Sequence, residues 1–133
     1  MKFGYMLFYV ADVEKSLEFF EGALGLARKF YNIENDQAYG ELESGATTIG
    51  FISFALAKAQ GIEFSKPDPR RPAPACDIGF VTENVKEAYD RAIDHGTVPI
   101  HAPEQKPWGQ TVSYVRDPNG FLVSINSQVE QKQ

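Results

Sequence analysis

The segment that decides the fold reads YMLFYVADVEKSLEFFEGALG, over residues 5–25. Its first part, Tyr5 to Val10, is an apolar run that predicts a buried strand. Asp12 is a residue type that caps free helix amides, and apolar residues then recur at helical spacing, at positions 13, 17, 20 and 24. Gly25 is suited to a left-handed C-terminal cap. The segment therefore predicts a strand that leads directly into an amphipathic helix.

The same construction returns 72 residues further along the chain, where position 77 takes the place of position 5. Asp77 to Val81 predicts a second short strand, and Asn84 opens a second helix with apolar residues at positions 85, 89, 92 and 93. Gly96 ends that helix. Sequence identity between the copies is weak, but the caps and the periodicity agree, which indicates a two-copy internal repeat.

Both copies continue as β-structure after the helix. The pattern predicts strands at 27–33, 37–43 and 47–54 in the first copy, and at 97–101, 110–116 and 121–126 in the second. A type I turn is predicted at Asp117-Pro118-Asn119-Gly120, with proline second and glycine fourth. Four prolines in the segment 65–75 exclude regular structure there.

These elements predict an α+β fold made of two tandem βαβββ modules. Module one covers about residues 1–64, the linker about 65–75, and module two about 76–133. A chain of 133 residues has the length of one ordinary domain, so both modules are expected to form a single domain.

Composition excludes several classes of function. Thirteen Lys and Arg against eighteen Asp and Glu give a net charge of −5, which argues against a nucleic-acid surface. The apolar run after Lys2 is too short to span a bilayer, so no membrane association is expected. The single cysteine, Cys76, cannot form an internal disulfide and indicates a reducing compartment, so we expect a cytoplasmic protein. With two histidines, a metal site would have to consist mostly of carboxylates.

The tandem βαβββ plan, the Asp-Val-x-Lys-Ser-Leu-x-Phe-Phe stretch at 12–20 and the Arg-Asp-Pro-Asn-Gly turn at 116–120 resemble the vicinal oxygen chelate superfamily. That group includes glyoxalase I, extradiol dioxygenases, methylmalonyl epimerase and bleomycin-resistance proteins. The resemblance covers nearly the whole chain. It implies that the two modules form a curled mixed sheet around a cleft, and that the protein is a homodimer.

The resemblance also implies where a metal would be held, because members carry His, Gln or Glu ligands at four strand positions. In this chain those positions are Tyr5, Gly50, Asp77 and Ser124. Only Asp77 is a competent ligand, and one carboxylate does not hold a catalytic metal. We therefore expect no metal site and no cofactor.

Strand periodicity separates the side chains that would face the cleft from those that would face the helices. If the first helix packs on the Phe8 side of its strand, Tyr5 and Tyr9 face the cleft. The same alternation, together with the loop at 104–109, gives a predicted ligand-binding set: Tyr5, Tyr9, Asp77, Trp108, Tyr114, Ser124 and Asn126.

This set is aromatic and sparsely polar, which favours a flat organic ligand held by stacking, with Asp77 attracting a cationic group. It resembles the bleomycin-resistance branch, whose members bind a drug and sequester it without a metal. The sequence thus predicts a metal-independent small-molecule binding protein, with an aromatic or cationic antibiotic as one candidate ligand, and antibiotic resistance as the corresponding role.

Alternatives stay open at this point. The chain could be a glyoxalase-like lyase, isomerase or epimerase, or a dioxygenase, with or without a divalent metal. In the metal-free version Asp77 would act as general base and Tyr5 as proton donor, so the catalytic residues are unknown. A third alternative is an interaction protein whose cleft its own side chains fill. Plainer roles also exist for individual residues: Trp108 as loop packing, His101 as a loop residue and Cys76 as a buried thiol.

Overall fold

A computed structural model describes residues 1–129 of the chain. The chain divides into two compact units, the first spanning Met1–Lys66 and the second beginning at Pro67. Each unit contains one βαβββ module, so the predicted α+β class with tandem modules is confirmed.

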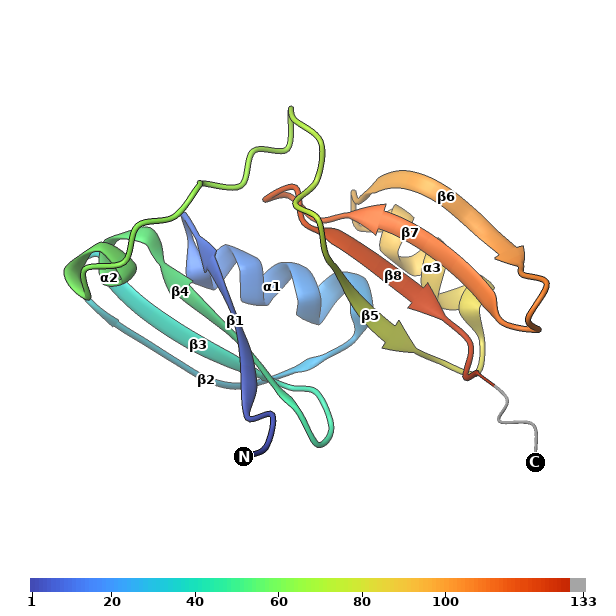
Figure 1. Cartoon of the computed structure of the whole chain (residues 1–133), viewed down its shortest axis with the longest axis horizontal. Helices are drawn as coiled ribbons and strands as arrows, with labels where there is room; N and C mark the ends of the chain where they lie inside the picture. The colour runs from blue at the N-terminus through green and yellow to red at the C-terminus, as the bar shows by residue number, and fades with distance from the viewer. Residues whose placement is uncertain (130–133) are drawn as a thin grey trace. The chain divides into compact units, whose positions relative to one another are not determined.

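The first unit is a four-stranded mixed sheet with one long helix on it (Figure 1). Along the chain its elements are β1 (Tyr5–Val10), α1 (Val13–Leu24), β2 (Ala27–Glu34), β3 (Gln37–Glu43), β4 (Thr48–Ser53) and α2 (Phe54–Ala59). The strand order is β1-β4-β3-β2, with β1 parallel to β4 and the other pairs antiparallel.

The second unit repeats this plan without a counterpart of α2 (Figure 1). Its elements are β5 (Asp77–Val81), α3 (Val85–Asp94), β6 (Val98–Gln105), β7 (Thr111–Arg116) and β8 (Leu122–Asn126). The strand order is β5-β8-β7-β6, again with the first strand parallel to its neighbour.

The predicted helix caps are present in both units. Asp12 accepts a hydrogen bond from the Lys15 amide at 3.1 Å, and Gly25 ends α1 with a left-handed φ of 70°. Asn84 accepts from the Glu87 amide at 3.1 Å and starts α3. These bonds satisfy amides that a helix start leaves free, which explains why the two helices begin where they do.

One face of each sheet packs on its long helix and forms the core. In the first unit the Phe51 ring lies 6.0 Å from the Phe8 ring and 5.4 Å from the Phe20 ring of α1, and all three are buried. In the second unit, Val123 and Ile125 are buried on the corresponding face. The prediction that the helices take the Phe8 and Ile125 faces is therefore correct. We call the opposite sheet face of each unit its open face.

Most strand ends lie within one residue of the prediction, and the main differences are an added helix and a longer strand β6. Strand β4 ends at Ser53, one residue before the predicted end, because the Ser53 hydroxyl accepts from the Leu56 amide at 3.2 Å and caps the unpredicted helix α2. Strand β6 continues beyond the predicted end at His101 to Gln105, through Pro103. An edge strand tolerates proline because one side of its backbone makes no ladder bonds.

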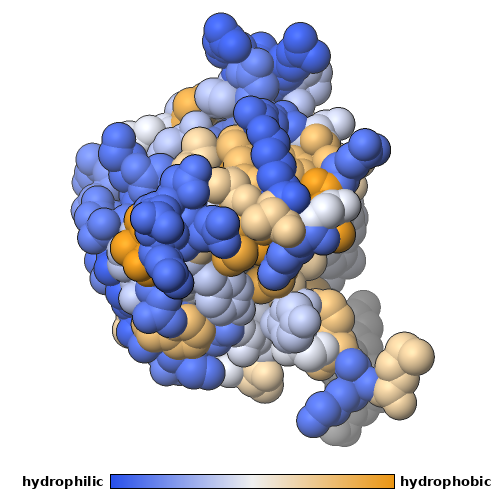
Figure 2. All heavy atoms as spheres, turned by 90° about the vertical axis from the view of Figure 1, so that its left-hand side faces the viewer, coloured by the Kyte–Doolittle hydropathy of each residue, from blue (hydrophilic) through white to orange (hydrophobic). Residues whose placement is uncertain are grey.

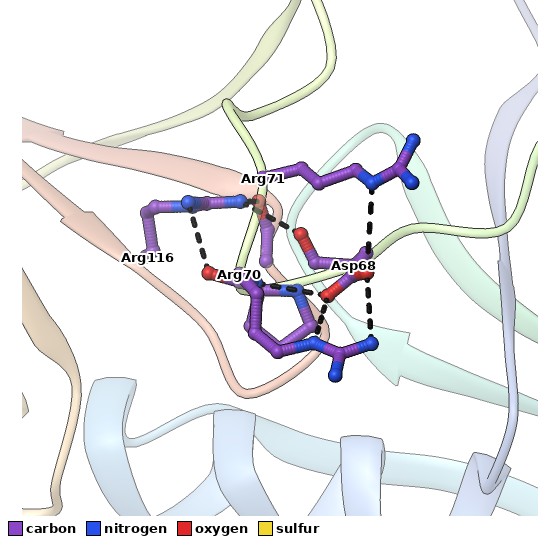
Figure 3. A network of polar contacts seen from close by, with 6 residues as sticks. Asp68, Arg70, Arg71 and Arg116 are labelled. Carbon is purple, nitrogen blue, oxygen red and sulfur yellow. Dashed lines mark hydrogen bonds and ion pairs between the residues drawn. The ribbon is translucent and has the colours of Figure 1, made fainter.

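The linker is tied to the second unit by Arg116 (Figure 3). The Arg116 guanidinium donates to the Gly120 carbonyl at 2.9 and 2.7 Å, and to the carbonyls of Pro69 and Asp68 at 3.3 and 3.4 Å. Asp68 in turn accepts from the Arg70 backbone amide at 2.9 Å. The linker therefore has no helix or strand, as predicted, but its middle is fixed to the turn before β8.

No helix within residues 1–129 is both long and apolar enough to cross a membrane. Cys76, expected to be buried, is exposed just before β5.

Candidate functional site

The open face of the first unit carries four aromatic side chains. Strand register places on it Tyr5, Leu7 and Tyr9 of β1, Gly50 and Ile52 of β4, Tyr39 and Glu41 of β3, and Phe30 of β2. Tyr5 is 63% exposed, so its ring is available to a ligand. The predicted cleft-facing side of β1 is therefore the side without a helix.

Gly50 lies at the middle of this face and is covered by two neighbours. A Cβ atom at position 50 would lie 2.7 Å from Leu7 Cδ2 and 3.2 Å from the Tyr39 hydroxyl. Real Cβ atoms do not approach other atoms as closely as 2.7 Å, so Leu7 and Tyr39 occupy the space above Gly50. A side chain at position 50 would have to displace them.

A polar cluster lies beside Gly50 on β3. The Tyr39 hydroxyl donates to a Glu41 carboxylate oxygen at 2.5 Å, and Lys29 lies 3.7 Å from the other oxygen. Burial, the hydrogen bond to Glu41 and the negative charge of Glu41 all raise the pKa of Tyr39. Tyr39 is therefore a protonated hydrogen-bond donor at neutral pH.

Part of this open face is covered by the chain itself. Phe64, which follows α2, meets the Tyr9 ring edge-on at a centroid distance of 5.2 Å and packs on Phe54 at 5.3 Å. Lys66 lies over the Phe54 ring at 5.2 Å. Tyr9 thus packs against its own chain, while Tyr5 at the other end of β1 stays exposed. Figure 2 shows the side of the molecule that carries α2, where apolar residues are exposed among hydrophilic ones.

The open face of the second unit carries a row of cross-strand neighbours. From β5 to β6 this row is Gly79, Ser124, Tyr114 and His101. The Tyr114 and His101 rings meet edge-on at a centroid distance of 6.1 Å. His101, the last residue of the strand predicted at 97–101, lies inside β6, which extends to Gln105. It therefore belongs to the candidate surface.

Ser124 and Asn126 are the buried polar residues of this face, with exposed fractions of 3% and 9%. Asn126 Nδ2 donates to Ser124 Oγ at 2.9 Å. A Cβ atom at position 79 would lie 3.2 Å from Ser124 Oγ and 3.7 Å from Asn126 Nδ2. Beside Ser124, the neighbouring strand β5 therefore presents only backbone, because Gly79 has no side chain.

Asp77 and Trp108 are at the periphery of the second unit. Asp77 is exposed at the start of β5, on the same side as Gly79. Trp108 is 59% exposed in the loop after β6, where its indole N–H donates to Gln110 Oε1 at 2.9 Å. Gln110 donates to the Ser127 carbonyl at 3.0 Å, so the Trp108 loop is tethered to the end of β8.

Comparison with known proteins identifies the family. Residues 2–125 match the family model described as Glyoxalase/Bleomycin resistance protein/Dioxygenase superfamily. The chain belongs to this superfamily.

Similar proteins are found both by sequence and by fold. The uncharacterized protein YraH of Bacillus subtilis (strain 168) is 28% identical over 127 residues, which cover 94% of this chain and 97% of that protein. A glyoxalase-related enzyme from Fulvimarina pelagi is similar in structure, with a TM-score of 0.79 and 17% identity over 96% of this chain and 88% of that one. TioX from Micromonospora sp. ML1 is also similar, with a TM-score of 0.71 and 14% identity over 96% and 98% of the two chains.

The residues at the superfamily's metal positions do not fit a metal. Tyr5, Gly50, Asp77 and Ser124 offer one carboxylate, and the space above Gly50 is taken by Leu7 and Tyr39. Within residues 1–129, no three His, Cys, Asp or Glu side chains are grouped so as to hold a metal ion.

The structure adds residues that sequence reasoning missed. Leu7, Tyr39 and Glu41 join the open face of the first unit, and Phe64 covers part of it. The alternation along 37–43, with Ala38, Gly40 and Leu42 on the other side, was a signal for Tyr39 and Glu41. Nothing in the sequence pattern pointed to Phe64, because its contacts depend on the helix that precedes it.

Proposed function

We propose that this superfamily member is a metal-independent binding protein for flat aromatic small molecules, of the bleomycin-resistance type. The observation that carries the proposal is the filled space above Gly50, where Leu7 and Tyr39 occupy a position that metal-using members need for a ligand. In place of metal-ligating side chains, the open faces carry aromatic rings and hydrogen-bonding side chains. Such a surface binds and orients an organic molecule by stacking and shape.

Aromatic groups support the ligand class. Tyr5 of the first unit exposes most of its ring, and Tyr114 and His101 of the second unit form a ring pair on an open face. Each aromatic contact to a ligand ring contributes about 0.5–1.5 kcal/mol beyond the burial of area. Contacts to both rings of the second-unit pair suit a planar molecule better than an aliphatic one.

Charge supports a cationic substituent on the ligand. The chain carries a net charge of −5, and Asp77 is exposed on the open-face side of β5. Glu41 contributes less, because Lys29 lies 3.7 Å from its carboxylate. A planar cation, including an antibiotic of that shape, is therefore the ligand we expect.

A thermal-shift screen with planar aromatic cations and their saturated analogues tests this function. We expect the aromatic members to raise the unfolding midpoint and the saturated ones to leave it unchanged. Tyr114→Leu should weaken binding about two- to tenfold, the range that 0.5–1.5 kcal/mol allows. Tyr89→Leu is the matched control, because Tyr89 is also half-buried in the second unit but lies on α3.

Failure of every aromatic compound to bind would contradict the proposal. Conversion of a bound compound would instead favour the alternative class, an isomerase, epimerase or dioxygenase, and product analysis by mass spectrometry detects it.

Homodimer formation and a cytoplasmic location are part of the proposal. Superfamily members are expected to pair their modules, and an exposed Cys76 suits a reducing compartment. Light scattering after size exclusion measures the mass in solution, for which we expect twice the 14.8 kDa of one chain.

A further inference from the structure

A hollow of about 410 Å³ opens on the surface of the first unit, beside the end of α2. We call it the α2 hollow. It is lined by Lys58, Ile62, Glu63, Phe64 and Lys66, none of which lies on a strand. Its volume falls within the range of about 300–1,000 Å³ that small-molecule sites have. The α2 hollow is therefore a second candidate site, distinct from the open faces of the sheets.

The segment that forms the hollow is held in place by its own chain. The Ile62 amide donates to the Ala57 carbonyl at 3.2 Å, which closes the turn after α2. Phe64 packs on Phe54 at a centroid distance of 5.3 Å and meets Tyr9 at 5.2 Å. A site that exists before its ligand arrives loses little conformational entropy on binding. The α2 hollow is such a site.

Apolar surface lines one part of the hollow. Ile62 is exposed, and Phe64 is half-buried, so part of each side chain contacts solvent. A ligand ring placed against them would remove this surface from water, and stacking on Phe64 would favour an aromatic ring over a saturated one.

Positive charge lines the other part. Lys58 and Lys66 form no ion pair with any carboxylate of residues 1–129. The Lys66 ammonium lies over the Phe54 ring at 5.2 Å, so charge and aromatic surface are close together. Glu63 is the single acidic residue of the lining, which leaves a net charge of +1 in a chain whose net charge is −5. The hollow therefore favours an anion.

We propose that the α2 hollow binds a small aromatic carboxylate. Its ring would lie against Phe64 and Ile62, and its carboxylate would face the ammonium groups of Lys58 and Lys66. The inference goes beyond the proposed function, which places a planar cation on the open faces. The two ligand classes have opposite charge, so one set of probes tests both proposals separately.

Three probes separate the ring from the charge: 2-naphthoate, 2-naphthylmethylammonium and cyclohexanecarboxylate. Titration of the ¹⁵N-labelled full chain locates each probe and gives its dissociation constant from chemical-shift changes. We expect 2-naphthoate to shift the amide signals of residues 58–66 in a saturable way. It should bind there at least about threefold tighter than either of the other probes, which lack the favourable charge or the ring. Added NaCl should weaken it.

Charge-removing variants test the lining directly. Lys58→Gln and Lys66→Gln should each weaken 2-naphthoate binding by up to about fivefold, the range of an exposed charge pair. Glu63→Gln should tighten it by a similar factor, and a misfolded variant would not gain affinity. Lys15→Gln is the matched control, because Lys15 is an exposed lysine of the same unit that lies on α1, away from the hollow.

Equal affinity of 2-naphthoate and 2-naphthylmethylammonium at residues 58–66 would overturn the inference, because the lysines would then not select the ligand. Signals that shift with 2-naphthoate only on the strands would also overturn it, since the anion would then occupy an open face. So would an affinity that Glu63→Gln and the two lysine variants leave unchanged. None of these results bears on the proposed function, which the cationic probe tests by its shifts on the open faces.

Discussion

Leu7 occupies the space directly above Gly50, since a Cβ atom at position 50 would lie 2.7 Å from Leu7 Cδ2. The two residues are cross-strand neighbours on β1 and β4. A glycine on a central strand therefore allows close packing here, and Leu7 fills the space next to the position at which the family resemblance implies a metal ligand.

This relationship predicts a coupled pair of substitutions. Gly50→Ala should lower the free energy of unfolding by up to about 1 kcal/mol, because the half-buried Leu7 side chain must move aside. In the background of Leu7→Ala the same change should cost less, because the neighbour that it meets is gone. Urea unfolding of the two single variants and the double variant gives the coupling.

Gly4→Ala is the control for that cycle, since a Cβ atom at position 4 would meet no atom within 4 Å. Strictly additive effects of the Gly50 and Leu7 substitutions would show that Leu7 does not hold this space.

A second prediction concerns the linker, which a substitution at Gly120 should loosen. A side chain at position 120 would be strained by the backbone φ of 98°. It would also clash with the linker, because a Cβ atom there would lie 2.9 Å from Pro69 Cα. Gly120→Ala should loosen the segment that Arg116 holds, so trypsin should cut after Arg70 several times faster than in the unmodified chain. Limited proteolysis followed by mass spectrometry measures this rate.

Gly61→Ala is the control for a positive φ without a contact. Gly61 has a φ of 79°, but a Cβ atom there would meet nothing within 4 Å. Equal cleavage after Arg70 in both variants would mean that contact with Pro69 does not hold the linker.

Asp117 predicts a pH dependence of stability. Burial raises the pKa of Asp117 from its usual 3.8, against opposing hydrogen bonds from Asn119 and from backbone amides. The folded state thus binds the proton more tightly than the unfolded state, so the contribution of Asp117 to stability falls as the pH rises from about 4 through the raised pKa. The Asp117→Asn variant has no ionisable group at this position, so its stability lacks this dependence on pH.

Urea unfolding between pH 4 and pH 7 measures the difference between the two proteins. We expect the stability of the unmodified chain, relative to Asp117→Asn, to decrease with increasing pH over this interval. A relative stability that increases with pH would contradict the account, because it would mean that the fold lowers the pKa of Asp117.

Local signals in the sequence were enough to predict the modules. Asp12, Gly25 and Asn84 mark helix ends through bonds to residues three or four positions away, so a single segment contains the information. Strand alternation likewise placed Phe8 in the core and Tyr5 on the open face. The repeat then provided an independent check, because both copies gave the same order of elements.

What the sequence did not predict depends on contacts between distant segments. The cover that Phe64 forms on Tyr9 requires α2, which begins only because Ser53 caps it. Strand β6 continues beyond His101 through Pro103 as an edge strand, whereas a proline by itself indicates a break.

Calorimetric titration of metal-stripped protein with an aromatic compound selected by the thermal-shift screen shows whether ligand binding is independent of metal. The titration is carried out in EDTA and again with one equivalent of Ni²⁺, Zn²⁺, Mn²⁺ or Fe²⁺ per chain. The account predicts dissociation constants that agree within about twofold in all cases, a difference well below 1 kcal/mol. Binding or turnover that appears only with a stoichiometric metal would contradict it.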